Sequence, residues 1–119
     1  MENRPRYTYN EVTVSGPIKN PVLDSYIPGE EIVSRKYTQM ADIQEKTAIG
    51  YLNELTNKYP PGTQITNSPF NSKALRDDYL KGDMILEIPV QNSPIPQNIL
   101  DIATNKNIKI RDITGKVYN

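Results

Sequence analysis

The chain has 119 residues, a formal net charge of zero from 14 basic and 14 acidic residues, and neither histidine nor cysteine. This composition excludes imidazole acid–base chemistry, thiolate nucleophiles and zinc sites built from cysteine and histidine ligands. The length is that of one domain, and 36% hydrophobic residues with ten prolines indicate a small core and much ordered loop.

The N-terminal region is rich in proline and glycine. A few residues within it hint at a short strand, but residues 1–19 are expected to form a linker-like arm before a single domain at residues 20–119. The polar character of residues 1–20 predicts no signal peptide. We expect no membrane span, because no apolar run approaches the ~20 residues that cross a bilayer. The residues that hint at the strand are Tyr7, Tyr9, Val12 and Val14.

The segment at residues 30–39 is predicted to be a strand, because Ile32, Val33 and Tyr37 have high β propensity. Arg35 and Lys36 interrupt it on opposite faces. Adjacent cations in a strand indicate either an exposed edge or a charge that points into a site.

Residues 41–59 are predicted to form an amphipathic helix. Apolar residues recur at intervals of three and four, which places them on one stripe. Pro60, Pro61 and Gly62 end the helix. The stripe consists of Ala48, Tyr51, Leu52, Leu55 and Tyr59.

The C-terminal half alternates short strands and one helix. A short strand at residues 63–66 precedes a polar loop at 67–81, and loops of that length are usually functional or mobile. A strand at 83–91, a helix at 94–105 and strands at 108–113 and 116–118 follow. The sequence therefore predicts an α+β fold: a small, mostly antiparallel sheet of about five short strands with two helices.

Polar residues on the predicted strands are the candidates for chemistry. Glu87 and Gln91 share one face of their strand, where they suit a general base or a substrate anchor. Arg35 and Lys36 suit a phosphate clamp, since arginine binds anions bidentately and lysine acts as a point charge. From the pattern alone, an ordinary solvated or ion-paired surface is the favoured explanation of both pairs.

A metal-dependent nuclease is a further alternative, with Asp83 and Glu87 as the ligands. The acidic nuclease pattern places a lysine two residues after the glutamate, but Glu87 is followed by Ile88 and Pro89. The sequence therefore predicts neither a protein-held metal nor a cofactor.

The region from Asn20 to Tyr118 resembles C-terminal toxin domains of bacterial polymorphic toxins, which sit at the tips of filamentous-haemagglutinin-like effectors of contact-dependent growth inhibition. The resemblance covers most of the chain. Its most specific segments are EIVSRK at 31–36, LEIPVQ at 86–91, and IRD, Gly115-Lys116 and Tyr118 near the C-terminus.

The resemblance implies an effector that is secreted as part of a larger protein, acts in the cytoplasm of a target cell and is neutralised by a cognate immunity protein. Many such domains are nucleases that cut tRNA or rRNA. The resemblance then implies a metal-independent RNase in which Glu87 or Gln91 positions the 2′-hydroxyl, while Arg35, Lys36 and Arg111 hold phosphate.

A non-catalytic protein-binding module of a larger secreted protein is the alternative function. The neutral net charge and the ten prolines favour it, because nucleic-acid binders usually carry a basic excess.

Overall fold

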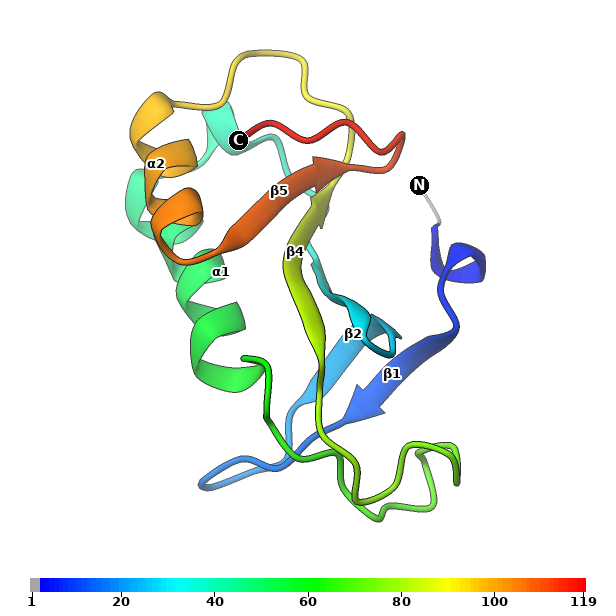
Figure 1. The fold of residues 1–119 in the computed structure, drawn as a ribbon. Helices are drawn as coiled ribbons and strands as arrows, with labels where there is room; N and C mark the ends of the chain where they lie inside the picture. The colour runs from blue at the N-terminus through cyan, green and yellow to red at the C-terminus, as the bar shows by residue number, and fades with distance from the viewer. Residues whose placement is uncertain (1–2) are drawn as a thin grey trace.

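The computed structural model describes residues 3–119, and within that range the chain forms a five-stranded mixed sheet with two α-helices. The predicted α+β class is confirmed (Figure 1). In chain order the elements are η1 (Arg4–Arg6), β1 (Tyr9–Thr13), β2 (Val22–Ile27), β3 (Glu30–Arg35), η2 (Met40–Asp42), α1 (Glu45–Lys58), β4 (Gly82–Ile88), α2 (Gln97–Asn105) and β5 (Ile108–Asp112).

The strands lie in the sheet in the same order as in the chain, β1-β2-β3-β4-β5. The first two connections are short, so β1, β2 and β3 pair antiparallel. The connections through α1 and α2 are long crossovers, which return the chain in the same direction and make β3, β4 and β5 parallel. Isolated antiparallel bridges extend the sheet at its margins: Val14–Ile65, Gln64–Tyr79 and Arg111–Val117.

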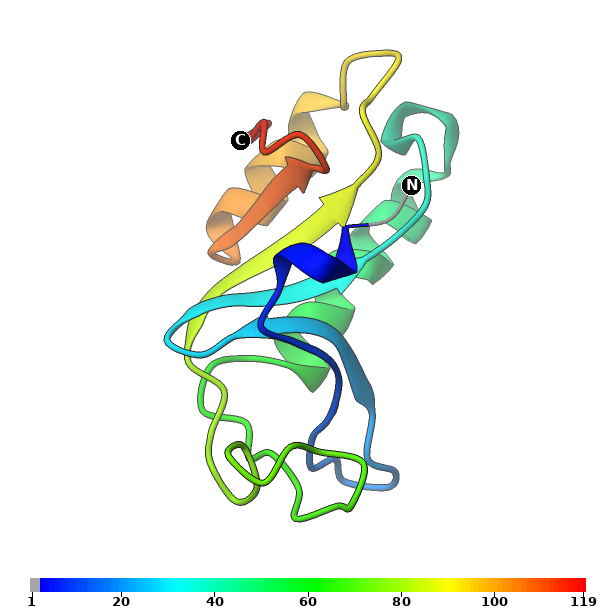
Figure 2. The same ribbon diagram turned by 90° about the vertical axis from the view of Figure 1, so that its right-hand side faces the viewer.

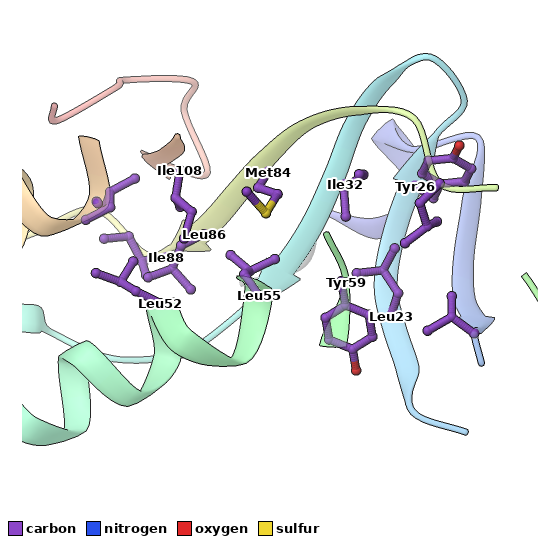
Figure 3. Packing of buried hydrophobic residues seen from close by; sticks show 14 of the residues in the cluster. Leu23, Tyr26, Ile32, Leu52, Leu55, Tyr59, Met84, Leu86, Ile88 and Ile108 are labelled. Carbon is purple, nitrogen blue, oxygen red and sulfur yellow. The ribbon is translucent and has the colours of Figure 1, made fainter. Parts of the chain in front are cut away.

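Both α-helices cover one face of the sheet, and the main core lies between them and the strands (Figures 1 and 2). The predicted stripe of α1 provides Leu52 and Leu55, which are fully buried. They lie on the side of α1 that faces β4, where Leu86 and Ile88 point toward them (Figure 3). Burial of each such side chain stabilises the fold by about 1.5–3 kcal/mol.

The N-terminal segment covers the opposite face of the sheet (Figure 2). Tyr7 packs there with Val33 and Ile85 in a second, smaller cluster. Residues 9–13 of the segment expected to be a linker-like arm instead form the edge strand β1. Residues 1–2 of the expected arm lie outside the described residues.

Several elements end at different residues in the structure from those that the sequence predicts. The strand at 30–39 stops at Arg35, and the one at 83–91 stops at Ile88, just before Pro89, which has no N–H for the ladder. Residues 63–66 and 116–118 contribute isolated bridges instead of strands. Among the described residues, none of the helices combines the length and the apolar character that crossing a bilayer requires.

Gly82 begins β4 in a backbone conformation with φ +134°, at a close approach to β3. A Cβ atom at this position would lie 2.5 Å from the carbonyl carbon of Glu30. Only glycine fits there, and this contact lies at the start of the parallel register between β3 and β4. That register determines which side chains meet further along the two strands.

Candidate functional site

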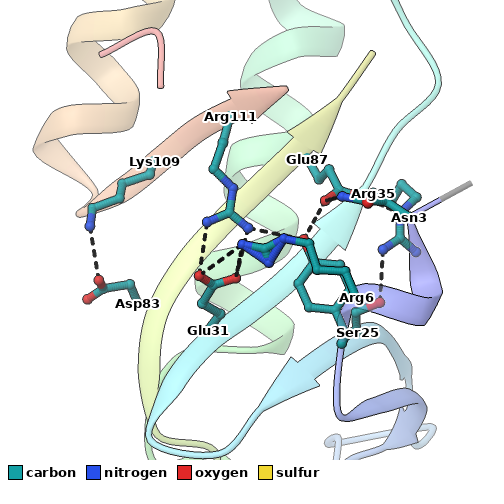
Figure 4. A network of polar contacts seen from close by, with 10 residues as sticks. Asn3, Arg6, Ser25, Glu31, Arg35, Asp83, Glu87, Lys109 and Arg111 are labelled. Atoms are coloured by element: carbon teal, nitrogen blue, oxygen red, sulfur yellow. Dashed lines mark hydrogen bonds and ion pairs between the residues drawn. The ribbon is translucent and has the colours of Figure 1, made fainter. Parts of the chain in front are cut away.

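Three of the five predicted site residues meet on the face of the sheet that the helices leave open (Figure 4). The parallel register places Arg35 of β3 beside Glu87 of β4, and Glu87 beside Arg111 of β5. All three side chains therefore project from one row across the sheet, and all three residues are buried.

Glu87 is the centre of this row. Its Oε1 accepts a hydrogen bond of 2.7 Å from Nε of Arg35. Its Oε2 accepts one from the hydroxyl of Tyr7 and one of 3.0 Å from the amide of Asn3. A second nitrogen of Arg35 donates to the hydroxyl of Ser25 on β2 at 2.9 Å. The carboxylate is thus bonded from three sides.

Arg111 closes the other end of the row. Its guanidinium donates to both carboxylate oxygens of Glu31, at 3.0 and 2.8 Å, and to the hydroxyl of Tyr7 at 3.0 Å. The hydrogen bonds from Arg111 lower the pKa of Glu31. Burial, together with the hydrogen bond to Glu87, raises the pKa of Tyr7 to about 12. Tyr7 therefore stays protonated at neutral pH and links the two arginine–glutamate pairs.

We call these residues the closed network, because their charged groups pair with one another. It comprises Tyr7, Glu31, Arg35, Glu87 and Arg111. Two arginines face two glutamates, and the N-terminal segment covers them. Buried ion pairs of this kind need all their hydrogen bonds to offset desolvation. The network joins β3, β4, β5 and the N-terminal segment, and Arg35 adds β2 through Ser25. Arg35 and Arg111 are each 8% exposed, so little of either guanidinium is left for a phosphate.

The structure places Gln91 outside this network. Its side-chain oxygen accepts from the backbone of Met40 at 2.8 Å, and its amide donates to the carbonyls of Thr38 and Pro89 at 3.1 and 2.9 Å. Gln91 therefore connects the segment after β3 to the segment after β4 through hydrogen bonds.

Lys36 points the opposite way from Arg35, toward the helices. Its Nζ lies 3.1 Å from Oε1 of Glu54 on α1 and 5.2 Å from the ring centre of Tyr51. Asp83, the other residue of the metal-site alternative, is exposed and pairs with Lys109 at 3.0 Å, so it does not join Glu87.

An open cleft of about 680 Å³ lies where Lys36 leaves the sheet. Its walls are the β1–β2 connection, the start of β2, the end of β3 and the C-terminal half of α1. Asp24, Lys36 and Glu54 line it together with Tyr59 and Lys58. The cleft sits beside β3, the strand that divides the antiparallel half of the sheet from the parallel half.

The charged groups of the cleft are close enough to influence one another. Oδ2 of Asp24 accepts a hydrogen bond of 2.7 Å from the backbone of Arg35, while Glu54 pairs with Lys36 and, at 3.8 Å, with Lys58. Burial, followed by the carboxylates of Glu54 and Asp24, raises the pKa of Tyr59 to about 12. With Lys19, which also lines it, two carboxylates and three lysines surround this opening.

Ser34 is an unusual residue of β3, although it is buried and is not among the residues that line the cleft. The antiparallel pairing of β2 and β3 ends at Ser25 and Val33, and Ser34 is the next residue of β3. The side chain of Ser34 lies on the same side of β3 as Lys36, two residues later. Among residues 3–119, its hydroxyl is the one buried side-chain polar atom with no hydrogen-bond partner. Such an atom in a native structure requires an explanation, such as a ligand or a catalytic role.

Replacing Ser34 with alanine is expected to raise the free energy of unfolding by about 1 kcal/mol, because an unsatisfied buried hydroxyl carries a desolvation penalty. The matched change, Ser25→Ala, is expected to lower it by about 1–2 kcal/mol, since the Ser25 hydroxyl bonds both Arg35 and Asn10. Chemical denaturation of both variants measures the difference. A loss of stability in Ser34→Ala equal to that in Ser25→Ala contradicts the assignment of Ser34 as unsatisfied.

The cleft could hold a cation only with help from a substrate. Within residues 3–119, no group of three or more acidic, histidine or cysteine side chains is placed to bind a metal. Magnesium, however, is often held by one or two carboxylates, with waters and substrate phosphates supplying the other oxygens. Asp24 and Glu54 are the two carboxylates that line the cleft, and Glu54 is paired with Lys36 and Lys58.

Comparisons with protein-family models, curated proteins and solved structures find no significant match for this chain.

Proposed function

We propose that this chain is a nuclease effector domain of an interbacterial competition system, and that it cleaves nucleic acid in the cleft lined by Asp24, Lys36 and Glu54. The observation that carries the proposal is that two carboxylates and three lysines line one open cleft of about 680 Å³. The resemblance to polymorphic toxin domains supports secretion within a larger effector, action in the target-cell cytoplasm and neutralisation by an immunity protein.

The chain's own residues have distinct tasks in this proposal. Lys36, held by Glu54, contacts the scissile phosphate or the attacking water as a point charge. Asp24 has one oxygen bonded to the Arg35 backbone and directs its other oxygen to the reacting group or a cation. A divalent cation bound there would polarise the phosphate and acidify a bound water.

This arrangement shifts the proposal away from the metal-independent RNase implied by the resemblance. That chemistry requires Arg35 and Arg111 to stabilise the phosphate, but both are committed to Glu87 and Glu31. Cleavage in the cleft would not require a 2′-hydroxyl on the substrate. Both DNA and RNA are therefore substrates to test.

Two experiments test the proposal together. The chain is expressed from a tightly repressed promoter, and the purified protein is incubated with RNA and with DNA in magnesium or in EDTA. We expect growth arrest, and cleavage that EDTA abolishes. Cleavage of RNA that continues in EDTA would favour the metal-independent RNase. Normal growth with soluble, inactive protein would overturn the nuclease proposal.

A non-catalytic protein-binding module is the second candidate, and one observation favours it. Ile18 and Phe70 are 94% and 87% exposed, so two large apolar side chains are available to a partner protein. A binding module would tolerate loss of the Asp24 carboxylate without any change in its effect on cells, whereas a nuclease would not.

A further inference from the structure

The cleft opens where strands β2 and β3 separate. Their backbone pairing ends at Ser25 and Val33. Beyond that last pair, Asp24 on the β2 side and Lys36 on the β3 side both line the cleft. The position of Asp24 relative to β3 therefore depends on the side-chain bonds that hold the two strands together where the backbone ladder has stopped.

Arg35 holds the two strands together at this point. Its backbone N–H donates to Oδ2 of Asp24 at 2.7 Å, in the place of the carbonyl that a longer ladder would supply. Its guanidinium donates to the hydroxyl of Ser25 at 2.9 Å, on the face of the sheet away from the helices (Figure 4). We call these two bonds the Arg35 tie, because one residue of β3 holds two neighbouring residues of β2.

The side chain of Arg35 is itself fixed. Its Nε donates to Oε1 of Glu87 on β4 at 2.7 Å, and the two side chains are 4% and 0% exposed. A guanidinium is planar and its donors form a rigid fork, so one that bonds Glu87 and Ser25 through different nitrogens has little freedom to move. A lysine at this position would carry all its donors on one nitrogen, which cannot reproduce two separate donor positions.

We infer that Arg35 is a positioning residue for the proposed cleavage: the Arg35 tie fixes the Asp24 carboxylate in the cleft, and Glu87 acts through it by orienting the guanidinium. This inference rests on the proposed nuclease function and gives Arg35 a task other than holding phosphate. Such a carboxylate needs a fixed direction, because a misplacement of about 1 Å can cost about 100-fold in rate. The buried guanidinium itself contacts no substrate.

The test compares steady-state cleavage by Arg35→Lys and by Arg111→Lys. Arg111 is the matched control, because it is equally buried and its guanidinium bonds Glu31 and Tyr7 rather than β2. We expect Arg35→Lys to lower kcat about 10- to 100-fold with KM nearly unchanged, while Arg111→Lys keeps the kcat of the unchanged protein. Equal losses of kcat in the two variants, or full activity of Arg35→Lys, would overturn the positioning role.

A second readout is independent of cleavage. Hydrogen exchange of the backbone amide at position 35, followed by NMR, reports on its bond to Asp24, and Asp24→Ala gives the rate for the released amide. We expect exchange to quicken toward that rate in Arg35→Lys and to stay slow in Arg111→Lys. Unchanged protection in Arg35→Lys would overturn the Arg35 tie whether or not nucleic acid is cleaved. The expected exchange in a protein that cleaves no nucleic acid would keep the tie and overturn the nuclease function.

Ser25→Ala is the second variant, for the case that Arg35→Lys does not fold. It removes one partner of the guanidinium and leaves Arg35 paired with Glu87. The amide at position 35 should then exchange faster than in the unchanged protein, and kcat should fall, both by less than in Asp24→Ala. A Ser25→Ala protein in which neither quantity changes would overturn the Arg35 tie.

Discussion

Replacing Glu87 with alanine is expected to lower the free energy of unfolding by about 3–5 kcal/mol, because it leaves Arg35 buried without its carboxylate. The loss extends beyond that pair. The hydroxyl of Tyr7 and the amide of Asn3 also donate to Glu87 and would lose their acceptor. Urea or guanidinium unfolding of the purified variant measures the change.

Asp83→Ala is the matched control for this prediction. Asp83 lies on the same strand and pairs with Lys109 at 3.0 Å, but its side chain is 63% exposed, whereas that of Glu87 is 0% exposed. Exposed ion pairs contribute only about 0–1 kcal/mol, so Asp83→Ala should change the stability little. Similar losses in the two variants would contradict the view that Glu87 holds a buried network together.

A milder change at the same position separates charge from hydrogen bonding. Glu87→Gln keeps an acceptor for Arg35 or Tyr7 but removes the negative charge that balances the guanidinium. Its stability should therefore lie between those of the unchanged protein and Glu87→Ala. This result would assign part of the stabilisation to the ion pair itself.

The strands and helices could be predicted because their side chains alternate with the period of each element. Met84, Leu86 and Ile88 face the helices, and Leu52 and Leu55 lie on the buried side of α1, as their spacing indicates. The pairing of β3, β4 and β5 could not be read from alternation, because period two is the same in parallel and antiparallel strands. Crossover length is the signal that distinguishes them: each pair of successive parallel strands is separated by a helix.

The candidate site shows a sharper limit. Arg35, Glu87 and Arg111 do meet, as their strands predict. Tyr7, however, comes from a segment expected to be an arm, and its hydroxyl bonds Glu87 and Arg111 and covers them from solvent. Lys36 does not join Arg35, because neighbouring residues along an extended chain point to opposite faces of the sheet. No local pattern indicates which of the two faces another segment of the chain will cover.

Asp24 was missed by the sequence interpretation although a signal for it exists. Asp24 and Ser34 each lie five residues from Gly29, so a hairpin centred on that glycine brings the two to matching positions on its strands. Asp24, Ser34 and Lys36 could therefore be grouped from the hairpin alone. Glu54 joins them only through the packing of α1, which no spacing in the sequence predicts.

Asp24→Asn is expected to reduce nucleic-acid cleavage at least about 1,000-fold while leaving the stability nearly unchanged. Asparagine has the same shape and its side-chain oxygen can still accept from the backbone of Arg35, so the junction of β2 and β3 should persist. The amide lacks the negative charge that a carboxylate offers to a cation or a reacting proton, and removal of one electrostatic group typically costs about 10²–10³ in rate. The larger expectation reflects the dependence of both metal and water on this oxygen.

The measurement pairs steady-state cleavage with thermal unfolding, and Asp101→Asn, the same chemical change at an exposed position on α2, is the control. Asp101→Asn should cleave like the unchanged protein. An Asp24→Asn protein that unfolds early would point to a structural role, and Glu54→Gln, which keeps a side chain able to contact Lys36, then becomes the decisive variant. Full activity in both Asp24→Asn and Glu54→Gln would move the site out of the cleft, because no other pair of carboxylates lines that opening in the described part of the chain.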